Sequence, residues 1–199
     1  MKKDEQRVAD FLKGFGLAPK PFIKEEKGRQ KTPDFRVFKD EAFAFYCEVK
    51  SIKKDEWLNK LLEKAPSGIN VGGARHDPIP NRISNDIHTA TKQFDSVNPA
   101  VKDPNVLALV NNDTNCGFTD LFEATSGCFW AEGNNFYPSL KNISEGRIKE
   151  EKWRIHLFLW LDSFKSDQFM FTFVDDRFVN ILCSYFGKDP NKIKKIPHT

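Results

Sequence analysis

Two acidic residues and one lysine stand at spacings that would gather them into one site. Asp34 opens the segment DFRVF, and Glu48 and Lys50 lie near the end of FAFYCEVKS. Side chains alternate across a strand, so Glu48 and Lys50 would share one face, about 7 Å apart along the chain. A hairpin between the two segments would return Glu48 to Asp34. The pattern predicts two carboxylates and one ammonium group at a single point.

This group suits the hydrolysis of a phosphodiester bond. That reaction needs a hard cation to neutralise developing negative charge and to activate water. Mg²⁺ binds one or two carboxylates together with water and substrate phosphate, and a nearby lysine can orient or deprotonate the attacking water. Buried carboxylates are otherwise costly unless a metal or a lysine compensates them. The alternative interpretation is a surface aspartate beside an exposed Glu–Lys pair at a strand end.

The elements that would position these residues can be predicted from hydrophobic periodicity. In chain order they are a helix at 4–15, strands at 21–26, 34–38 and 43–51, a helix at 81–97 and a strand at 106–112. A turn at 39–42 would join the strands that carry Asp34 and Glu48. The last strand follows a helix, so it would run parallel to a neighbour. This order predicts an α/β fold with a mixed sheet flanked by helices.

The remaining segments would surround this core as one domain over 1–199. In chain order we expect an irregular stretch at 53–80 with a short helix around EWLNKLLEK, a helix at 118–125, loops at 127–152, a hairpin of strands at 153–164 and 168–176, a helix at 176–186 and a basic tail. The expected division is therefore a core at 4–112, a C-terminal hairpin and helix elaboration at 113–187, and the tail at 188–199.

Bulk composition limits the class of protein. With 39% hydrophobic and 30% charged residues, the chain should fold as a globular protein. A net charge of +3 permits nucleic acid as a partner without requiring it. The N-terminus has no apolar signal core, and no apolar run approaches the ~20 residues that span a bilayer. The four cysteines form no CxxC pair, so we expect reduced thiols, no membrane association and a cytoplasmic location.

The stretch Pro33-Asp34, thirteen residues, then Glu48-Val49-Lys50 resembles the signature of the PD-(D/E)XK nuclease superfamily. The predicted order of helix, three-strand meander, helix and strand resembles the core of that superfamily. The resemblance implies a restriction-endonuclease-like fold and Mg²⁺-dependent cleavage of nucleic acid, with DNA favoured and Mn²⁺ able to substitute. It implies that Asp34, Glu48 and the Val49 carbonyl hold the metal while Lys50 positions the water. Displacement of the 3′ oxygen would leave the phosphate on the 5′ end.

Two further candidates follow from the same resemblance. Members often carry an acidic residue on the first helix, and Glu5 stands there at the edge of the apolar face. Members also often carry Gln or Lys on the helix after the ExK strand, where Gln93 flanks the apolar stripe. The alternatives are a solvated first-turn Glu5 that favours the helix dipole and a solvated helix flank at Gln93.

Basic residues around the irregular stretch are candidates for phosphate contacts. The glycine-rich loop would let Arg75 close over a substrate strand together with Lys53, Lys54 and Arg82. The alternative is a solvated loop. His76 in the same loop is a further candidate, as a catalytic base. The basic tail would either help to hold nucleic acid or only keep the protein in solution.

Two other classes of function stay open at this point. The first is a non-catalytic nucleic-acid-binding or scaffold protein on the same fold, and the second is an interaction protein of unrelated fold in which the motif is a coincidence. No base-reading module is recognisable, so the form of the substrate and any sequence specificity stay open. A homodimer is also left open, because many nucleases pair to cut two strands.

Overall fold

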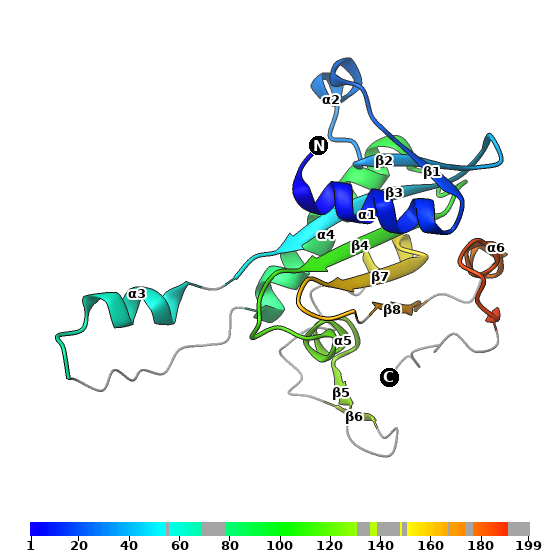
Figure 1. Cartoon of the computed structure of the whole chain (residues 1–199). Coiled ribbons are helices and arrows are strands. Elements are labelled where there is room, and N and C mark those ends of the chain that lie inside the picture. The colour runs from blue at the N-terminus through cyan, green and yellow to red at the C-terminus, as the bar shows by residue number, and fades with distance from the viewer. Residues whose placement is uncertain are drawn as a thin grey trace.

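The computed structural model of the 199-residue chain describes residues 1–54, 56–68, 79–130, 136–138, 148, 151–166, 168–173 and 177–190. These residues form an α/β protein in which a six-strand mixed sheet is flanked by helices (Figure 1). Among the described residues, no helix combines the length and the apolar character needed to cross a membrane.

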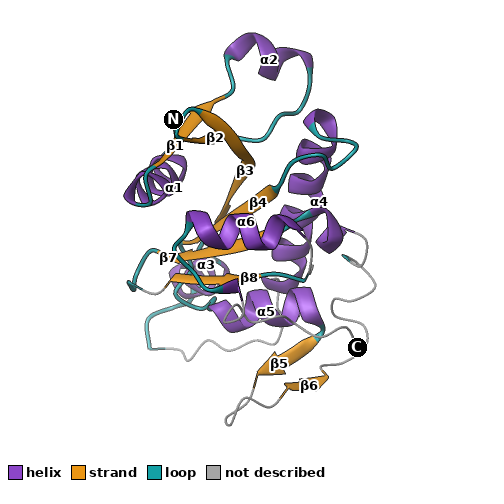
Figure 2. Ribbon diagram, turned by 90° about the vertical axis from the view of Figure 1, so that its right-hand side faces the viewer, coloured by secondary structure: helices purple, strands orange, loops and turns teal. Residues whose placement is uncertain are grey.

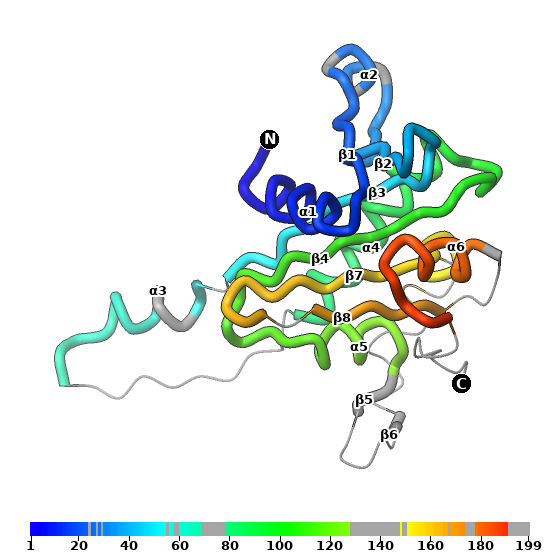
Figure 3. Tube along the Cα trace, turned by 45° about the vertical axis from the view of Figure 1, so that its right-hand side comes forward, coloured from blue at the N-terminus to red at the C-terminus, as the bar shows by residue number. Residues whose placement is uncertain are grey.

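The sheet has the strand order β1-β2-β3-β4-β7-β8. Its strands are β1 (Leu17–Pro21), β2 (Phe35–Lys39), β3 (Ala42–Ile52), β4 (Asn105–Asn111), β7 (Leu157–Asp162) and β8 (Gln168–Phe171). The pairs β3–β4 and β4–β7 are parallel, and the other three are antiparallel. The carboxyl ends of β3, β4 and β7 therefore meet at one edge, as Figure 3 shows. The predicted parallel strand is confirmed, and so is the antiparallel C-terminal hairpin.

Helices cover both faces of the sheet. They are α1 (Lys3–Gly14), α2 (Lys24–Arg29), α3 (Trp57–Lys64), α4 (Ile79–Val97), α5 (Phe118–Ser126) and α6 (Arg177–Tyr185), with a 3₁₀ turn η2 (Glu151–Arg154) and a small sheet of β5 (Cys128–Trp130) and β6 (Phe136–Pro138). One core joins α4 and α5 to the sheet, and a second core on the opposite face joins α1 and α6 to it. Figure 2 shows α1 and α4 on these two sides.

Side chains of β3 alternate between the two cores. Phe45, Cys47 and Val49 belong to the core beneath α1, whereas Ile52 belongs to the core beneath α4. Alternation therefore directs Glu48 and Lys50 toward the α4 face. All seven residues of the adjacent strand β4 are buried, as expected for a central parallel strand covered on both faces. The site residues of β3 are thus held on a rigid central element.

The strand predicted at 21–26 is wrong, because the strand ends at Pro21 and a helix begins at Lys24. The Glu26 side chain accepts the main-chain N–H of Ile23 at 3.0 Å, which caps this helix at its start. Proline is tolerated in β1 because β1 is an edge strand. The hydrophobic pattern alone did not reveal the capping interaction.

The strand predicted from 153 is shorter in the structure, since η2 takes residues 151–154 and β7 begins at Leu157. The short helix around EWLNKLLEK is confirmed as α3. Three of the four cysteines, Cys47, Cys116 and Cys183, are buried free thiols. The glycine-rich loop with Arg75 and His76, and the tail beyond residue 190, lie outside the described residues.

The hairpin between β2 and β3 turns at Asp40 and Glu41. Both residues have positive φ, 48° and 67°, which is the conformation of a two-residue hairpin turn that matches the twist of the sheet. The turn pairs Lys39 with Ala42, and after a register shift near Phe38 the strands continue to the pair Phe35–Cys47. Continuing this register by one residue places Asp34 opposite Glu48.

Candidate active site

The two predicted carboxylates meet at the end of the β2–β3 hairpin. Asp34 precedes β2, and its Oδ2 accepts the main-chain N–H of Val49 at 3.0 Å. Glu48 lies directly opposite in β3, and its side chain is only 2% exposed. The negative charge of Asp34 is one of the causes that raise the pKa of Glu48. The structure therefore brings Asp34 and Glu48 together, as the hairpin pattern predicts.

Glu48 is held in an electrostatically costly position. Burial, and then the charge of Asp34, raise the pKa of Glu48 to about 8, although Lys50 acts in the opposite direction. Glu48 Oε1 accepts from Lys50 Nζ at 2.6 Å, but Oε2 is buried and accepts from no donor among the described residues. The Asp34 side chain also lies within hydrogen-bond reach of the Glu48 carboxyl, which raises the pKa of Glu48 further. A buried carboxylate oxygen without a donor is expensive unless a cation compensates it. This oxygen and the neighbouring Asp34 fit a divalent cation by the chemistry of their donor set.

Lys50 is fixed by groups from two elements. Its Nζ contacts Glu48 Oε1 in its own strand and Gln93 Oε1 from α4, at 2.6 and 2.7 Å. Gln93 is oriented in turn, because its Nε2 donates to the carbonyl of Thr32 at 2.9 Å. An ammonium group has three N–H donors, so these two contacts leave one for a further acceptor. Gln93, which the family resemblance made a candidate, thus contacts Lys50, and its role in catalysis stays a prediction.

Glu5 is placed differently from Gln93, because α1 covers the opposite face of the sheet from α4. Glu5 Oε2 accepts the main-chain N–H of Lys2 at 3.0 Å, and its Oε1 lies 3.2 Å from Lys2 Nζ. Its hydrogen bond and charge raise the pKa of Lys2, and the charges of Asp34 and Glu48 act more weakly in the same direction. Glu5 thus holds Lys2 beside the carboxylates, and a direct role for Glu5 stays a prediction.

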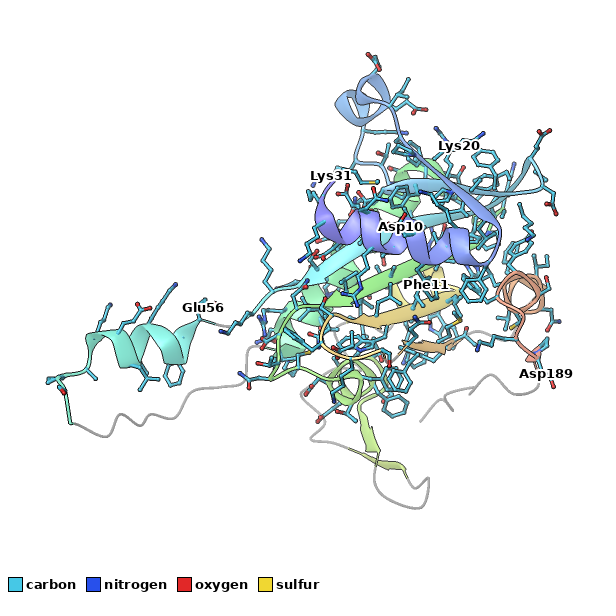
Figure 4. The ribbon with its side chains drawn as sticks, viewed as in Figure 1. Asp10, Phe11, Lys20, Lys31, Glu56 and Asp189 are labelled. Atoms are coloured by element: carbon cyan, nitrogen blue, oxygen red, sulfur yellow. The ribbon has the colours of Figure 1, made fainter. Side chains whose placement is uncertain are left out.

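A cleft of about 560 Å³ opens over the carboxylates, and four lysines line it. They are Lys2, Lys31, Lys50 and Lys53; Figure 4 labels Lys31, which lies in the segment between α2 and β2. Thr32, Ser51 and Thr89 add hydroxyl groups to the lining. A positive cleft around two carboxylates suits a polyanion bound together with a cation. The sequence prediction included Lys53 but missed Lys2 and Lys31, although Lys31 stands only three residues before Asp34.

The main chain of β3 also opens toward this cleft. The amide of Tyr46 donates to Pro104, and the carbonyl of Ile52 accepts from Asn112, so the even-numbered residues of β3 bond on the β4 side. Val49 instead donates toward Asp34, on the side where β2 has already ended. The two main-chain groups of a strand residue point to the same side. The Val49 carbonyl therefore faces the cleft, and its role as a metal ligand stays a prediction.

The residues predicted to contact phosphate have different surroundings in the structure. Lys53 lines the cleft, and Lys54 is exposed beyond the end of β3. Arg82 donates to the carbonyl of Lys53 at 2.6 Å and forms an ion pair with Asp113 at 2.9 Å. The Arg82 guanidinium therefore ties the end of β3 to the end of β4. Its contact with phosphate stays a prediction, and so does that of Arg75, which lies outside the described residues.

Asp86 is an acidic residue of α4 that sequence reasoning did not select. Burial raises its pKa to about 6, against the lowering charges of Lys50, Arg82 and Lys53. It stands one turn after Arg82 and two turns before Gln93, on the flank of α4 that faces Lys50. This spacing was the signal that could have identified it.

Within the described residues, no three His, Cys, Asp or Glu side chains gather closely enough to hold a metal ion. A cation at Asp34 and Glu48 would therefore complete its shell with the Val49 carbonyl, water and substrate oxygens, as Mg²⁺ commonly does. Comparison with protein-family models, curated proteins and solved structures found no match to the chain.

Proposed function

We propose that this protein is a metal-dependent nuclease that hydrolyses phosphodiester bonds, with DNA as its substrate. The observation that carries the proposal is the buried carboxylate of Glu48 beside part-buried Asp34, with Lys50 Nζ 2.6 Å from Glu48 and the second Glu48 oxygen without a donor among the described residues. A structural ion pair would have both carboxylate oxygens satisfied, because an unsatisfied buried oxygen has a large cost. A cation-binding role accounts for that oxygen.

The arrangement of the elements supports the same proposal. Helix α1, the antiparallel strands β1, β2 and β3, helix α4 and the parallel strand β4 follow one another in the order of the PD-(D/E)XK core, with α2 and α3 inserted. Strands β7 and β8 and helix α6 would then elaborate that restriction-endonuclease-like core. In this assignment the carboxylates lie where the two strands of the hairpin end.

Asp34, Glu48 and the Val49 carbonyl are the groups that would hold Mg²⁺, or Mn²⁺ in its place. The cation would supply charge neutralisation on the phosphate and a lower pKa for water. The lysines of the cleft, Lys2, Lys31 and Lys53, bind the flanking phosphates as point charges.

Lys50 carries the chemical step that the chain itself performs. Glu48 and Gln93 hold its ammonium group, and its third N–H orients a water for attack in line with the 3′ oxygen. The water oxygen forms the new bond to phosphorus and releases a proton to solvent. The bond to the 3′ oxygen breaks, and that oxygen takes a proton from solvent and leaves as a hydroxyl, so the phosphate stays on the 5′ end. Gln93 is a positioning residue in this scheme, because it acts through Lys50.

One panel tests the proposal. Plasmid, linear duplex, single-stranded DNA and RNA are incubated with the protein in Mg²⁺, Mn²⁺ or EDTA, beside Lys50→Ala and the control Lys13→Ala, which removes an exposed lysine of α1. We expect metal-dependent cleavage by the parent and by Lys13→Ala, and cleavage at least about 100-fold slower by Lys50→Ala. Equal cleavage by Lys50→Ala would refute the proposal.

The same panel separates the non-catalytic alternative. A nucleic-acid-binding or scaffold protein would bind DNA in EDTA, cleave nothing in either metal, and bind equally well after Asp34→Ala. The nuclease proposal instead requires that Asp34→Ala abolish metal-dependent cleavage. It also requires Mg²⁺ binding by the parent protein, measured by calorimetry, and much weaker binding by the variant.

A further inference from the structure

A second cleft, of about 550 Å³, opens where β4 and β7 end. Three phenylalanines line it, Phe118 from the start of α5, Phe164 from the turn after β7 and Phe169 from β8. We call it the aromatic cleft. Because β3, β4 and β7 are parallel, this cleft lies at the same edge of the sheet as the candidate active site.

The aromatic rings of this cleft are unusually exposed. Phe164 is 57% exposed and Phe169 is 39% exposed, although the core nearby is otherwise closed. Phe169 stacks on Phe118 with ring centroids 4.4 Å apart and an angle of 20° between the planes. The stacked pair is supported from below by buried Trp160, 6.5 Å from Phe118. Exposing apolar ring surface to water is unfavourable in free energy, and a flat ligand stacked on the rings would remove that surface from water.

The acidic groups of the cleft are engaged by the protein itself, so they do not define a cation site. Asp113 pairs with Arg82, and Asp162 Oδ1 accepts the main-chain N–H groups of Phe164 and Lys165. Asp120 accepts from the amide of Gly117 at the start of α5. What the lining offers a ligand is aromatic surface together with the polar groups of residues such as Thr114, Asn115 and Thr119. A nucleobase, with two flat faces and a polar edge, matches that chemistry.

The aromatic cleft and the candidate active site are separate clefts that one side chain connects. Arg82 contacts the carbonyl of Lys53, which lines the active-site cleft, and the carboxylate of Asp113, which lines the aromatic cleft. Phe118, Trp160 and Phe169 also belong to the α4 side of the sheet, the side that carries Glu48 and Lys50. Three strand spacings separate β3 from β8, the strand that carries Phe169, about 14 Å in all, which is about four nucleotides at about 3.4 Å of axial rise each.

We propose that the aromatic cleft holds an unpaired nucleobase of the strand whose phosphate occupies the Asp34–Glu48–Lys50 site. The inference rests on the proposed function and narrows its substrate class to nucleic acid with single-stranded or unpaired nucleotides beside the cleaved bond. A base in continuous duplex has both faces stacked on its neighbours, so it cannot enter the cleft without leaving the helix. The protein therefore prefers unpaired over fully paired substrates.

The test measures this preference by binding alone. Dye-labelled oligonucleotides, one fully paired and one with a single unpaired base, are titrated with the full chain in EDTA and followed by fluorescence anisotropy. We expect tighter binding of the unpaired form, and a loss of that preference by about 5- to 100-fold in Phe164→Ala and Phe169→Ala. Phe164→Leu keeps apolar bulk but not the ring plane, and it should lose most of the preference as well. Trp153→Ala, an exposed aromatic of η2, is the matched control and should keep it.

Each outcome decides the inference separately from the proposed function. An equal effect of Phe164→Ala on both oligonucleotides, full retention by Phe164→Leu, or an absence of any preference in the parent would each overturn the base-binding role. Cleavage is then assayed in Mg²⁺. Metal-dependent cleavage with no difference between paired and unpaired substrates removes the aromatic-cleft inference alone. A binding preference that depends on Phe164, with no cleavage under any metal, removes the nuclease proposal alone.

Discussion

Two ion pairs with buried carboxylates lie at the same edge of the sheet, and the two carboxylates differ in how completely their oxygens are hydrogen-bonded. Asp113 is fully buried, and it accepts from Arg82 at 2.9 Å and from the amide of Asn115 at 3.0 Å. Glu48 is almost as deeply buried, but one of its oxygens has no donor among the described residues. The first pair joins two strand ends. The second pair has a buried carboxylate oxygen without a donor and a raised carboxyl pKa, and it lies beside an open cleft. Such perturbed groups are typical of reactive sites.

The largest expected effect is a loss of cleavage activity when the Lys50–Glu48 pair is broken. Lys50→Ala should reduce cleavage of DNA in Mg²⁺ by about 10²- to 10⁴-fold, because it removes the group that orients the attacking water. Its fold should survive, since Glu48 can take up a proton in place of the lost partner. Single-turnover cleavage rates and circular dichroism check the two statements. Unaltered cleavage, or loss of the folded structure, would show that Lys50 has a structural role, like Arg82, and not a catalytic one.

The second prediction concerns the protonation of Glu48, which should make the unfolding free energy depend on pH. The pKa of Glu48 is raised to about 8 from an ordinary 4.5, so the folded protein holds a proton that the unfolded chain releases between these values. The stability that this proton contributes is complete below about pH 4.5 and is lost as the pH rises to about 8. The metal-free protein should lose as much as about 5 kcal/mol of unfolding free energy across this window.

Urea unfolding at several pH values measures this loss. Glu48→Gln should flatten the profile between about pH 6 and 8, above the range in which Asp86 contributes, and Mg²⁺ should restore stability at the alkaline end by binding the ionised carboxylate. Glu63→Gln, at an exposed position of α3, is the control and should leave the profile unchanged. A flat profile for the parent protein would show that Glu48 is ionised throughout.

Breaking the Arg82–Asp113 ion pair should lower stability directly. Arg82→Met leaves the buried Asp113 without its cation, and we expect a loss of about 3 kcal/mol in unfolding free energy. The double variant Arg82→Met, Asp113→Leu should lose less than the single variant, because no charge is left buried alone. Equal losses in the single and double variants would mean that packing, rather than charge, is the main contribution of Arg82.

The smallest expected effect concerns the turn that brings Asp34 opposite Glu48. Asp40 and Glu41 both have positive φ, which side chains disfavour. Replacing them by Asn-Gly, the preferred sequence of this turn, should raise unfolding free energy by about 1 kcal/mol without changing cleavage. Lys92→Gly, on the exposed side of α4, should instead lower the unfolding free energy by about 0.5–1 kcal/mol. A lower stability for the turn variant would show that the original side chains contribute contacts of their own.

The sequence allowed the local geometry of the site to be predicted better than its surroundings. Strand alternation alone places Glu48 and Lys50 on one face, and hairpin pairing places Asp34 opposite Glu48. Gln93 was predicted from a family resemblance, and the structure shows its contact with Lys50. Helix α2 was missed, because its start depends on a side-chain cap at Glu26 rather than on hydrophobic periodicity.

Residues that reach the site from distant segments were the hardest to predict. Lys2 and Lys31 lie on no periodic pattern, and they line the cleft only because the start of α1 and the approach to β2 meet there. The aromatic cleft combines α5, β7 and β8, whose relative positions depend on the strand order of the sheet. A single sequence carries no direct signal for that order.

The prolines of β1 have a consequence for association between chains. The N–H of Phe22 points toward β2, so the alternating positions Pro19 and Pro21 turn their main chain outward. Proline has no N–H, and this outer edge therefore lacks the donors that another strand would need at those two positions. A neighbouring molecule cannot readily extend the sheet beside the hairpin of Asp34 and Glu48. The edge nearest the site is thereby protected against strand-by-strand aggregation.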